Sequence, residues 1–152
     1  MKELRFGIIG LGLMGREFAS LSARWFHLLD MNVKPVITAV CDTNEKAVKW
    51  FTDNLPSINF TTSDYKELLA RADVDAVYCA VPHNLHEQFY TDIIKAGKHL
   101  LGEKPFGIDK AANDAINKVI AEHPNVFVRC SSEFPFFPGS TEVIKAIREN
   151  SF

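Results

Sequence analysis

Residues 4–15 combine a short apolar strand, a glycine-rich turn and the start of an amphipathic helix. The turn has the spacing G-x-G-x-x-G, at Gly10, Gly12 and Gly15. In a dinucleotide-binding unit the first glycine permits the tight turn. The second lets the backbone approach a pyrophosphate, and the third lets the helix pack closely on the strand. Phosphates then lie at a helix N-terminus, where N–H groups and the helix dipole favour negative charge. The segment therefore predicts a nucleotide site, with an ordinary structural turn as the alternative.

Strand and helix patterns alternate along the rest of the chain, with short connections. Strands are predicted over residues 4–9, 36–41, 58–60, 74–81, 98–102 and 126–130. The helix after the glycine turn is predicted to carry Phe18, Leu21, Trp25 and Leu28 on one face. Three more helices are predicted to begin after the N-caps Thr43, Ser63 and Asp109. Another is predicted over residues 84–96, with Gly97 as a C-cap residue, and a last one over 140–149. This order predicts an α/β fold with a doubly wound parallel sheet, the Rossmann fold.

In such a sheet the ligand crevice lies at the carboxyl ends of the strands, where Gly10, Asp42, Pro82 and Glu103 all fall. An acid at Asp42 can accept hydrogen bonds from the adenosine ribose and would repel a 2′-phosphate, so NAD is favoured and NADP is possible. Asp42 lies farther from Gly15 than the usual ~20 residues, and an insertion around residues 30–35 would explain the excess. The alternative is an acid that interacts only with a helix dipole.

Composition restricts the class of protein. The 152 residues match one ordinary domain, and a net charge of −2 offers no electrostatic argument for nucleic acid or an anionic membrane. No apolar run approaches the ~20 residues of a membrane helix, and the N-terminus has no signal-peptide pattern. Cys41, Cys79 and Cys130 are interpreted as buried, reduced thiols rather than a disulfide or zinc framework. We therefore expect a cytoplasmic protein without a metal site.

Residues 64–109 resemble the core of the Gfo/Idh/MocA oxidoreductases, which include glucose–fructose oxidoreductase and inositol dehydrogenase. The shared pattern is an apolar strand, Pro82, a histidine four positions later at His86, then A-G-K-H over 96–99 and E-K-P at Glu103-Lys104-Pro105. Together with the glycine turn, the resemblance covers residues 4–130. It implies an NAD(P)-binding Rossmann domain over 1–130.

The resemblance also implies a role for each matched position. Gly10, Gly12, Gly15 and the backbone of Leu13 and Met14 would hold the pyrophosphate, Asp42 and Thr43 the adenosine ribose, and Val81, Pro82, His83 and His86 the loop beside the phosphates and the nicotinamide ribose. His83 stands where the family often has asparagine. Glu103 would bind the nicotinamide-ribose hydroxyls, and Lys104 would lie beside the nicotinamide of the cofactor and direct its ammonium group at the substrate oxygen. Hydride transfer at a carbinol carbon changes the negative charge on that oxygen, and an ammonium group stabilises the charge or relays a proton. The alternatives are a solvated lysine at 104 and a first-turn polar residue at 86.

Residues 131–152 are expected to form a hinge and a final helix leading to a second domain with substrate contacts and an oligomer interface. The asparagine and arginine that the family often has near 131–139 are not present, and aromatic residues and prolines stand there instead. We expect an N-terminal fragment, inactive alone, of a homo-oligomeric oxidoreductase acting on a sugar, polyol or related hydroxy compound. Two alternatives are a non-catalytic dinucleotide sensor and the family's NAD-dependent glycosidases. Retention of Lys104 favours catalysis over sensing.

Overall fold

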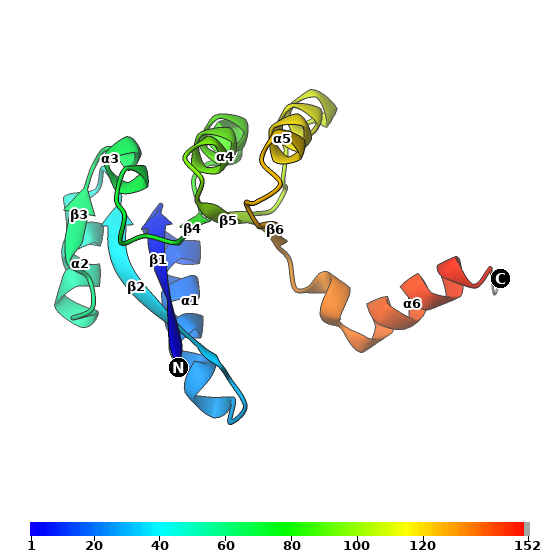
Figure 1. Cartoon of the computed structure of the whole chain (residues 1–152), viewed down its shortest axis with the longest axis horizontal. Helices are drawn as coiled ribbons and strands as arrows, with labels where there is room; N and C mark the ends of the chain where they lie inside the picture. The colour runs from blue at the N-terminus through cyan, green and yellow to red at the C-terminus, as the bar shows by residue number, and fades with distance from the viewer. Residues whose placement is uncertain (151–152) are drawn as a thin grey trace.

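Parallel strands form one sheet in a computed structural model that describes residues 1–150 (Figure 1). The sheet is six-stranded, in the order β3-β2-β1-β4-β5-β6. The strand bounds are Lys2–Ile9 for β1, Val33–Cys41 for β2, Phe60–Thr62 for β3, Ala76–Cys79 for β4, His99–Glu103 for β5 and Val128–Ser131 for β6. The strand order reverses between β1 and β4, and a ligand crevice in an open α/β sheet lies at this switch point. The α/β, doubly wound prediction is confirmed.

Helices cover the two faces of the sheet. Their bounds are Leu13–Ser22 for α1, Glu45–Asn54 for α2, Tyr65–Leu69 for α3, His86–Lys95 for α4, Lys110–Glu122 for α5 and Pro138–Arg148 for α6, with 3₁₀ turns Ala23–His27 (η1), His83–Leu85 (η2) and Phe134–Phe136 (η3). Apolar side chains of α1 and α2 pack on one face, and those of α3, α4 and α5 pack on the other. Figure 1 shows α4 and α5 side by side above β4 to β6.

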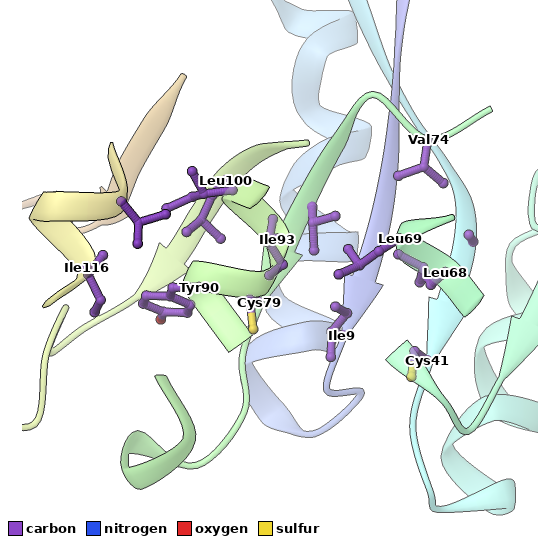
Figure 2. Close-up of a cluster of buried hydrophobic side chains, with 14 residues drawn as sticks. Ile9, Cys41, Leu68, Leu69, Val74, Cys79, Tyr90, Ile93, Leu100 and Ile116 are labelled. Atoms are coloured by element: carbon purple, nitrogen blue, oxygen red, sulfur yellow. The ribbon is translucent and has the colours of Figure 1, made fainter. Parts of the chain in front are cut away.

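The larger core cluster lies between the sheet and α3, α4 and α5 (Figure 2). It joins Ile9 of β1 and Cys79 of β4 to Tyr90 and Ile93 of α4. All four residues of β4 are buried, as expected for a central parallel strand with near-continuous apolar sequence. Strand β4 pairs with β1 in parallel, with Cys79 opposite Ile9. The carboxyl ends of these two strands therefore meet at one edge.

Two predicted N-caps are wrong. The cap of α2 is Asn44 rather than Thr43, and its side chain accepts hydrogen bonds from the backbone N–H of Lys46 and Ala47. The cap of α3 is Asp64 rather than Ser63. In both cases the longer Asn or Asp side chain, one residue later, reaches the free N–H groups of the first turn. The predicted cap Asp109 is confirmed. For α4 the sequence predicts Gly97 as the C-cap residue, but Ala96 is the C-cap and Gly97 follows it with φ of +73°.

The predicted first helix is too long. It ends at Ser22, and Trp25 lies in the 3₁₀ turn η1 while Leu28 lies beyond it, exposed. Strand β2 begins at Val33, within the predicted insertion. The apolar period of 3.6 residues continues past the end of the helix, but Trp25 and Leu28 line a surface cleft with Met31 instead of packing in the core.

The C-terminal segment extends away from the sheet (Figure 1). Helix α6 begins at Pro138, two residues before the predicted start, because proline suits the first turn of a helix. None of its residues is buried, and Val143 and Ile147 expose more than half of their surface. The described residues 1–150 contain no helix with the length and apolar character that a membrane crossing needs.

Candidate functional site

Four strand ends meet at one edge of the sheet. The backbone N–H of Gly10, after β1, donates to the carbonyl of Cys41, the last residue of β2. The N–H of Ala80, after β4, donates to the carbonyl of Ile9. Strand β5 ends at Glu103 beside β4. The edge therefore carries the glycine turn, Asp42, the loop 80–83 and Glu103, as the strand pattern predicted.

The glycine turn is closely packed at two positions and open at the third. Gly10 has φ of +92°, and a Cβ there would lie 2.6 Å from the carbonyl oxygen of Ala80. A Cβ on Gly15 would overlap the carbonyl oxygen of Gly10. A Cβ on Gly12 would meet no atom within 4 Å among the described residues. The turn thus presents free space only at Gly12, which is also the N-cap of α1.

The Asp42 carboxylate connects two backbone segments. Its Oδ2 accepts a hydrogen bond from the N–H of Leu11 at 2.7 Å, and its Oδ1 accepts one from the N–H of Asn44 at 2.8 Å. Asp42 therefore holds the glycine turn against the start of α2 as well as facing the edge. It lines an open cleft of about 380 Å³ together with Gly12 and Arg16. Thr43 is exposed beside it.

Glu103 is only 5% exposed and its carboxylate has two partners. Oε1 accepts a hydrogen bond from the hydroxyl of Tyr78 at 2.6 Å, and Oε2 accepts one from the N–H of Lys104 at 3.3 Å. Burial, followed by this bond to a carboxylate, raises the pKa of Tyr78, so the hydroxyl stays protonated and donates. Sequence reasoning missed Tyr78. The available signal was a tyrosine hydroxyl inside an otherwise apolar buried strand, which needs a partner.

The side chains of Tyr78 and Glu103 line a cleft of about 620 Å³ with the exposed Lys104. The wall opposite comes from α1 and from the segment after β6. The other lining residues are Met14, Glu17, Phe18, Leu21, Ser131, Ser132, Glu133 and Phe134. Phe18 stacks on Tyr78 with ring centroids 4.2 Å apart. The cleft is therefore lined by the ammonium group of Lys104 and by the carboxylates of Glu17, Glu103 and Glu133.

The two histidines of the predicted loop have different environments. His83 is exposed in η2, whereas the ring of His86 is fully buried. Nδ1 of His86 lies 2.7 Å from the carbonyl oxygen of Pro105, and Nε2 lies 3.1 Å from that of Val81. The loop Val81–His83 therefore follows β4 at this edge of the sheet, while the His86 ring is buried. The sequence did not reveal this burial because His86 stands at a helix start.

The thiols do not form a site in the described residues. Cys41 and Cys79 are buried and reduced, and burial raises the pKa of each to about 12. Cys130 is only half-buried, which corrects the prediction that all three are buried. Residues 1–150 contain no cluster of three His, Cys, Asp or Glu side chains suited to a metal ion.

The chain is similar to known proteins over the residues that form this sheet. A family model described as an oxidoreductase family with an NAD-binding Rossmann fold matches residues 4–130. An uncharacterized oxidoreductase, YrbE, of Bacillus subtilis (strain 168) is 31% identical over 113 residues, which are 73% of this chain and 31% of that protein. A 1,5-anhydro-D-fructose reductase of Ensifer adhaerens is 30% identical over 117 residues, 77% of this chain and 32% of that protein. Glycosyl hydrolase family 109 protein 2 of Shewanella sp. (strain ANA-3) is 34% identical over 114 residues, 69% and 23% respectively.

Solved structures show the same fold. The scyllo-inositol dehydrogenase of Lactobacillus casei with bound NAD(H) and scyllo-inositol has a TM-score of 0.78 at 25% identity. The superposition covers 99% of this chain and 42% of that one. This chain thus spans a third or less of the length of the three curated relatives and under half of the solved chain.

Proposed function

The chain belongs to the Gfo/Idh/MocA family of oxidoreductases, whose Rossmann fold binds NAD, and we propose that residues 1–130 place NAD for hydride transfer to or from a sugar, polyol or related hydroxy compound. The observation that carries the proposal is the open position at Gly12, at the N-terminus of α1 and at the switch point of the sheet. Asp42 and Glu103 lie at the same edge, one on each side of that position.

The glycine turn fits a pyrophosphate. Among residues 1–150 no side chain caps the N-terminus of α1, so its first N–H groups, at Leu13 and Met14, are available to an anion. The helix dipole favours negative charge at the same point. The space over Gly12 lets phosphate oxygens approach the backbone, while the close packing at Gly10 and Gly15 holds the turn in shape. These features support the pyrophosphate role of the whole turn.

The two ribose positions follow from the strand order. Asp42, with Thr43, accepts the adenosine ribose hydroxyls, since each carboxylate oxygen keeps lone pairs beyond its one backbone bond. The negative charge favours NAD over NADP. The backbone of Val81–His83 lies beside the phosphates and the nicotinamide ribose. Glu103, whose carboxylate is held by the Tyr78 hydroxyl, accepts hydrogen bonds from the hydroxyls of that ribose.

Lys104 acts on the substrate oxygen. NAD, when bound, supplies the acceptor or donor of the hydride. Lys104 is exposed in the 620 Å³ cleft, and Glu103 before it is buried, so the backbone that carries the ammonium group is well held. A positive charge there stabilises oxygen as it gains alkoxide character and can relay its proton. Lys104 is therefore the proposed catalytic residue.

A second candidate is the family's glycosidase chemistry, in which hydride transfer is transient. The specific observation in its favour is the 34% identity to a relative named as a glycosyl hydrolase. Glycoside cleavage with no net change in NADH would distinguish it. A non-catalytic sensor is less well supported because the chain keeps Lys104 in the cleft.

We also propose that residues 131–152 connect the nucleotide domain to a domain that binds substrate and forms a homo-oligomer. Helix α6 exposes Val143, Ile144 and Ile147, and η3 exposes Phe134 and Phe136. Apolar surface of this kind is usually covered by another protein surface. The family's relatives that act on sugars and polyols are consistent with a small hydroxylated substrate. The proposed partners include neither a nucleic acid nor a membrane, and the proposed location is the cytoplasm.

Changing Gly12 to alanine is expected to weaken NAD binding about tenfold or more without destabilising the chain. A methyl group fills the space that phosphate oxygens need, and losing charge-assisted hydrogen bonds of ~1.5–3 kcal/mol corresponds to roughly this factor. Calorimetric titration with NAD and thermal unfolding measure the two effects. Gly139→Ala is the matched control, because its Cβ also meets open space, in α6 away from the edge. Unchanged NAD affinity in Gly12→Ala, or no NAD binding by the parent chain, would contradict the proposal.

Changing Asp42 to asparagine is expected to narrow the preference for NAD over NADP. The substitution removes the charge that repels a 2′-phosphate and keeps one oxygen acceptor. Asp42→Ala should in addition weaken both cofactors, since the N–H groups of Leu11 and Asn44 lose their partner. Calorimetric titration of each variant with both cofactors tests this. Asp53→Asn, the same charge change at the end of α2, is the control. Equal affinity of the parent chain for NAD and NADP would refute the role of Asp42.

A further inference from the structure

The buried ring of His86 is in contact with two separate loops. It belongs to the first residue of α4, yet it is fully covered. Its Nδ1 faces the carbonyl of Pro105 at 2.7 Å and its Nε2 faces that of Val81 at 3.1 Å. Carbonyl oxygens only accept hydrogen bonds, so each ring nitrogen that bonds to one must carry a hydrogen; a neutral ring donates to one carbonyl, and only the doubly protonated ring donates to both at once. The ring thus bridges the ends of β4 and β5.

Tyr90, one helical turn later on α4, continues the contact. Its ring stacks on His86 with centroids 4.6 Å apart, and its hydroxyl donates to the carbonyl of Glu103 at 2.8 Å. A Cβ on Gly102 would lie 2.6 Å from the Tyr90 ring, so β5 rests directly on it. Figure 2 shows Tyr90 among the core side chains below β5. Helix α4 therefore contacts the carbonyl on each side of Lys104.

We propose that His86 is a positioning residue, which sets the place of Lys104 relative to the loop Val81–His83 by holding the carbonyls of Pro105 and Val81. The proposal rests on the proposed function of Lys104. It assigns His86 no contact with the cofactor, because a ring with no exposed surface cannot reach one. It also accounts for a histidine here: a phenylalanine fills the same space and stacks on Tyr90, but offers no donor to either loop.

Three variants of the 152-residue chain separate the two contacts. In His86→Asn the amide nitrogen occupies the place of Nδ1, so the bond to Pro105 is kept. In His86→Gln the amide nitrogen approaches the place of Nε2, so the bond to Val81 is kept. His86→Phe keeps only the stacking. His123→Phe is the control, since among residues 1–150 Nδ1 of His123 contacts only the carbonyl oxygen of Val119, in the helix α5 that His123 caps.

The first measurement is the amide ¹H–¹⁵N spectrum, which needs no ligand. We expect His86→Phe to shift the amide resonances of Lys104, Phe106 and His83, and to leave those of residues 10–15 unshifted. His86→Asn should restore Lys104 and Phe106, and His86→Gln should restore His83. Unmoved amides at Lys104 and Phe106 in His86→Phe, or the same shifts in all three variants, would overturn the proposal. If His86→Phe does not fold, the opposite patterns of the Asn and Gln variants decide.

The second measurement compares NAD with ADP-ribose, which lacks the nicotinamide. We expect His86→Phe to weaken NAD by about fivefold and to leave ADP-ribose unchanged, since a net hydrogen bond of ~1 kcal/mol acts only at the nicotinamide end. His86→Asn should recover most of the NAD affinity. An unchanged ratio of the two affinities would overturn the positioning role while leaving the proposed function intact. If the parent chain binds neither ligand, the proposed function fails and the amide spectra alone decide whether His86 links the loops.

Discussion

Gly15→Ala is expected to lower the free energy of unfolding by about 3 kcal/mol, the upper part of the range for overpacked positions. Its Cβ would overlap the carbonyl oxygen of Gly10. That oxygen cannot retreat easily, because Gly10 itself packs against the backbone of Ala80 at φ of +92°. Helix α1 would have to move away from β1, and the buried contact of Ala19 beneath it would loosen. Urea unfolding followed by circular dichroism gives the difference.

Gly12→Ala is the matched control for this prediction. It is the same substitution three residues earlier in the same turn, at a position with free space. Its unfolding free energy should stay within about 0.5 kcal/mol of the parent, as is usual for substitutions away from packed features. Equal unfolding midpoints for the two variants would show that the turn does not have the packing described. The pair therefore separates the structural glycine from the proposed binding glycine.

Lys104→Ala, in the polypeptide that carries the oxidoreductase activity, is expected to lower turnover about a hundredfold with NAD affinity nearly unchanged. The factor is that of a lost general acid–base or oxyanion-stabilising group. The cofactor contacts remain, because the neighbouring Glu103 is held by Tyr78 rather than by Lys104. Turnover is followed by NADH absorbance on the hydroxy compound oxidised fastest in a panel of polyols and sugars, and affinity is measured by calorimetry.

Lys110→Ala is the control for charge and size, since Lys110 lies at the start of α5 and pairs only with Asp114 among the described residues. Added primary alkylamines should restore part of the activity of Lys104→Ala, because they return an ammonium group to the vacated space. Parent-like turnover in Lys104→Ala would remove the catalytic role. Loss of NAD binding without loss of turnover at saturating NAD would instead make Lys104 a cofactor residue.

Much of the fold could be predicted because its signals are local. Apolar runs of strand length separated by helical periods gave the six strands and their parallel arrangement. The errors arose where one local preference competes with another. Thr43 and Ser63 are good caps in isolation, but Asn44 and Asp64 reach the same N–H groups with a longer side chain. Past Ser22 the apolar period continued although the backbone had changed to a 3₁₀ turn.

The features of the site also fall into those that local sequence predicts and those that depend on contacts between distant residues. The sequence alone determined the glycine turn, the succession of strands along the chain and the residues that end them, because turn chemistry and hydrophobic period depend on neighbours along the chain. Only the tertiary structure decided that Tyr78 holds Glu103, that Asp42 holds Leu11 and that the His86 ring is buried. These partners are separated by 19 to 31 residues and meet because β2, β1, β4 and β5 lie side by side in that order. A hydrogen bond across strands depends on the order and register of the sheet, which no single segment carries.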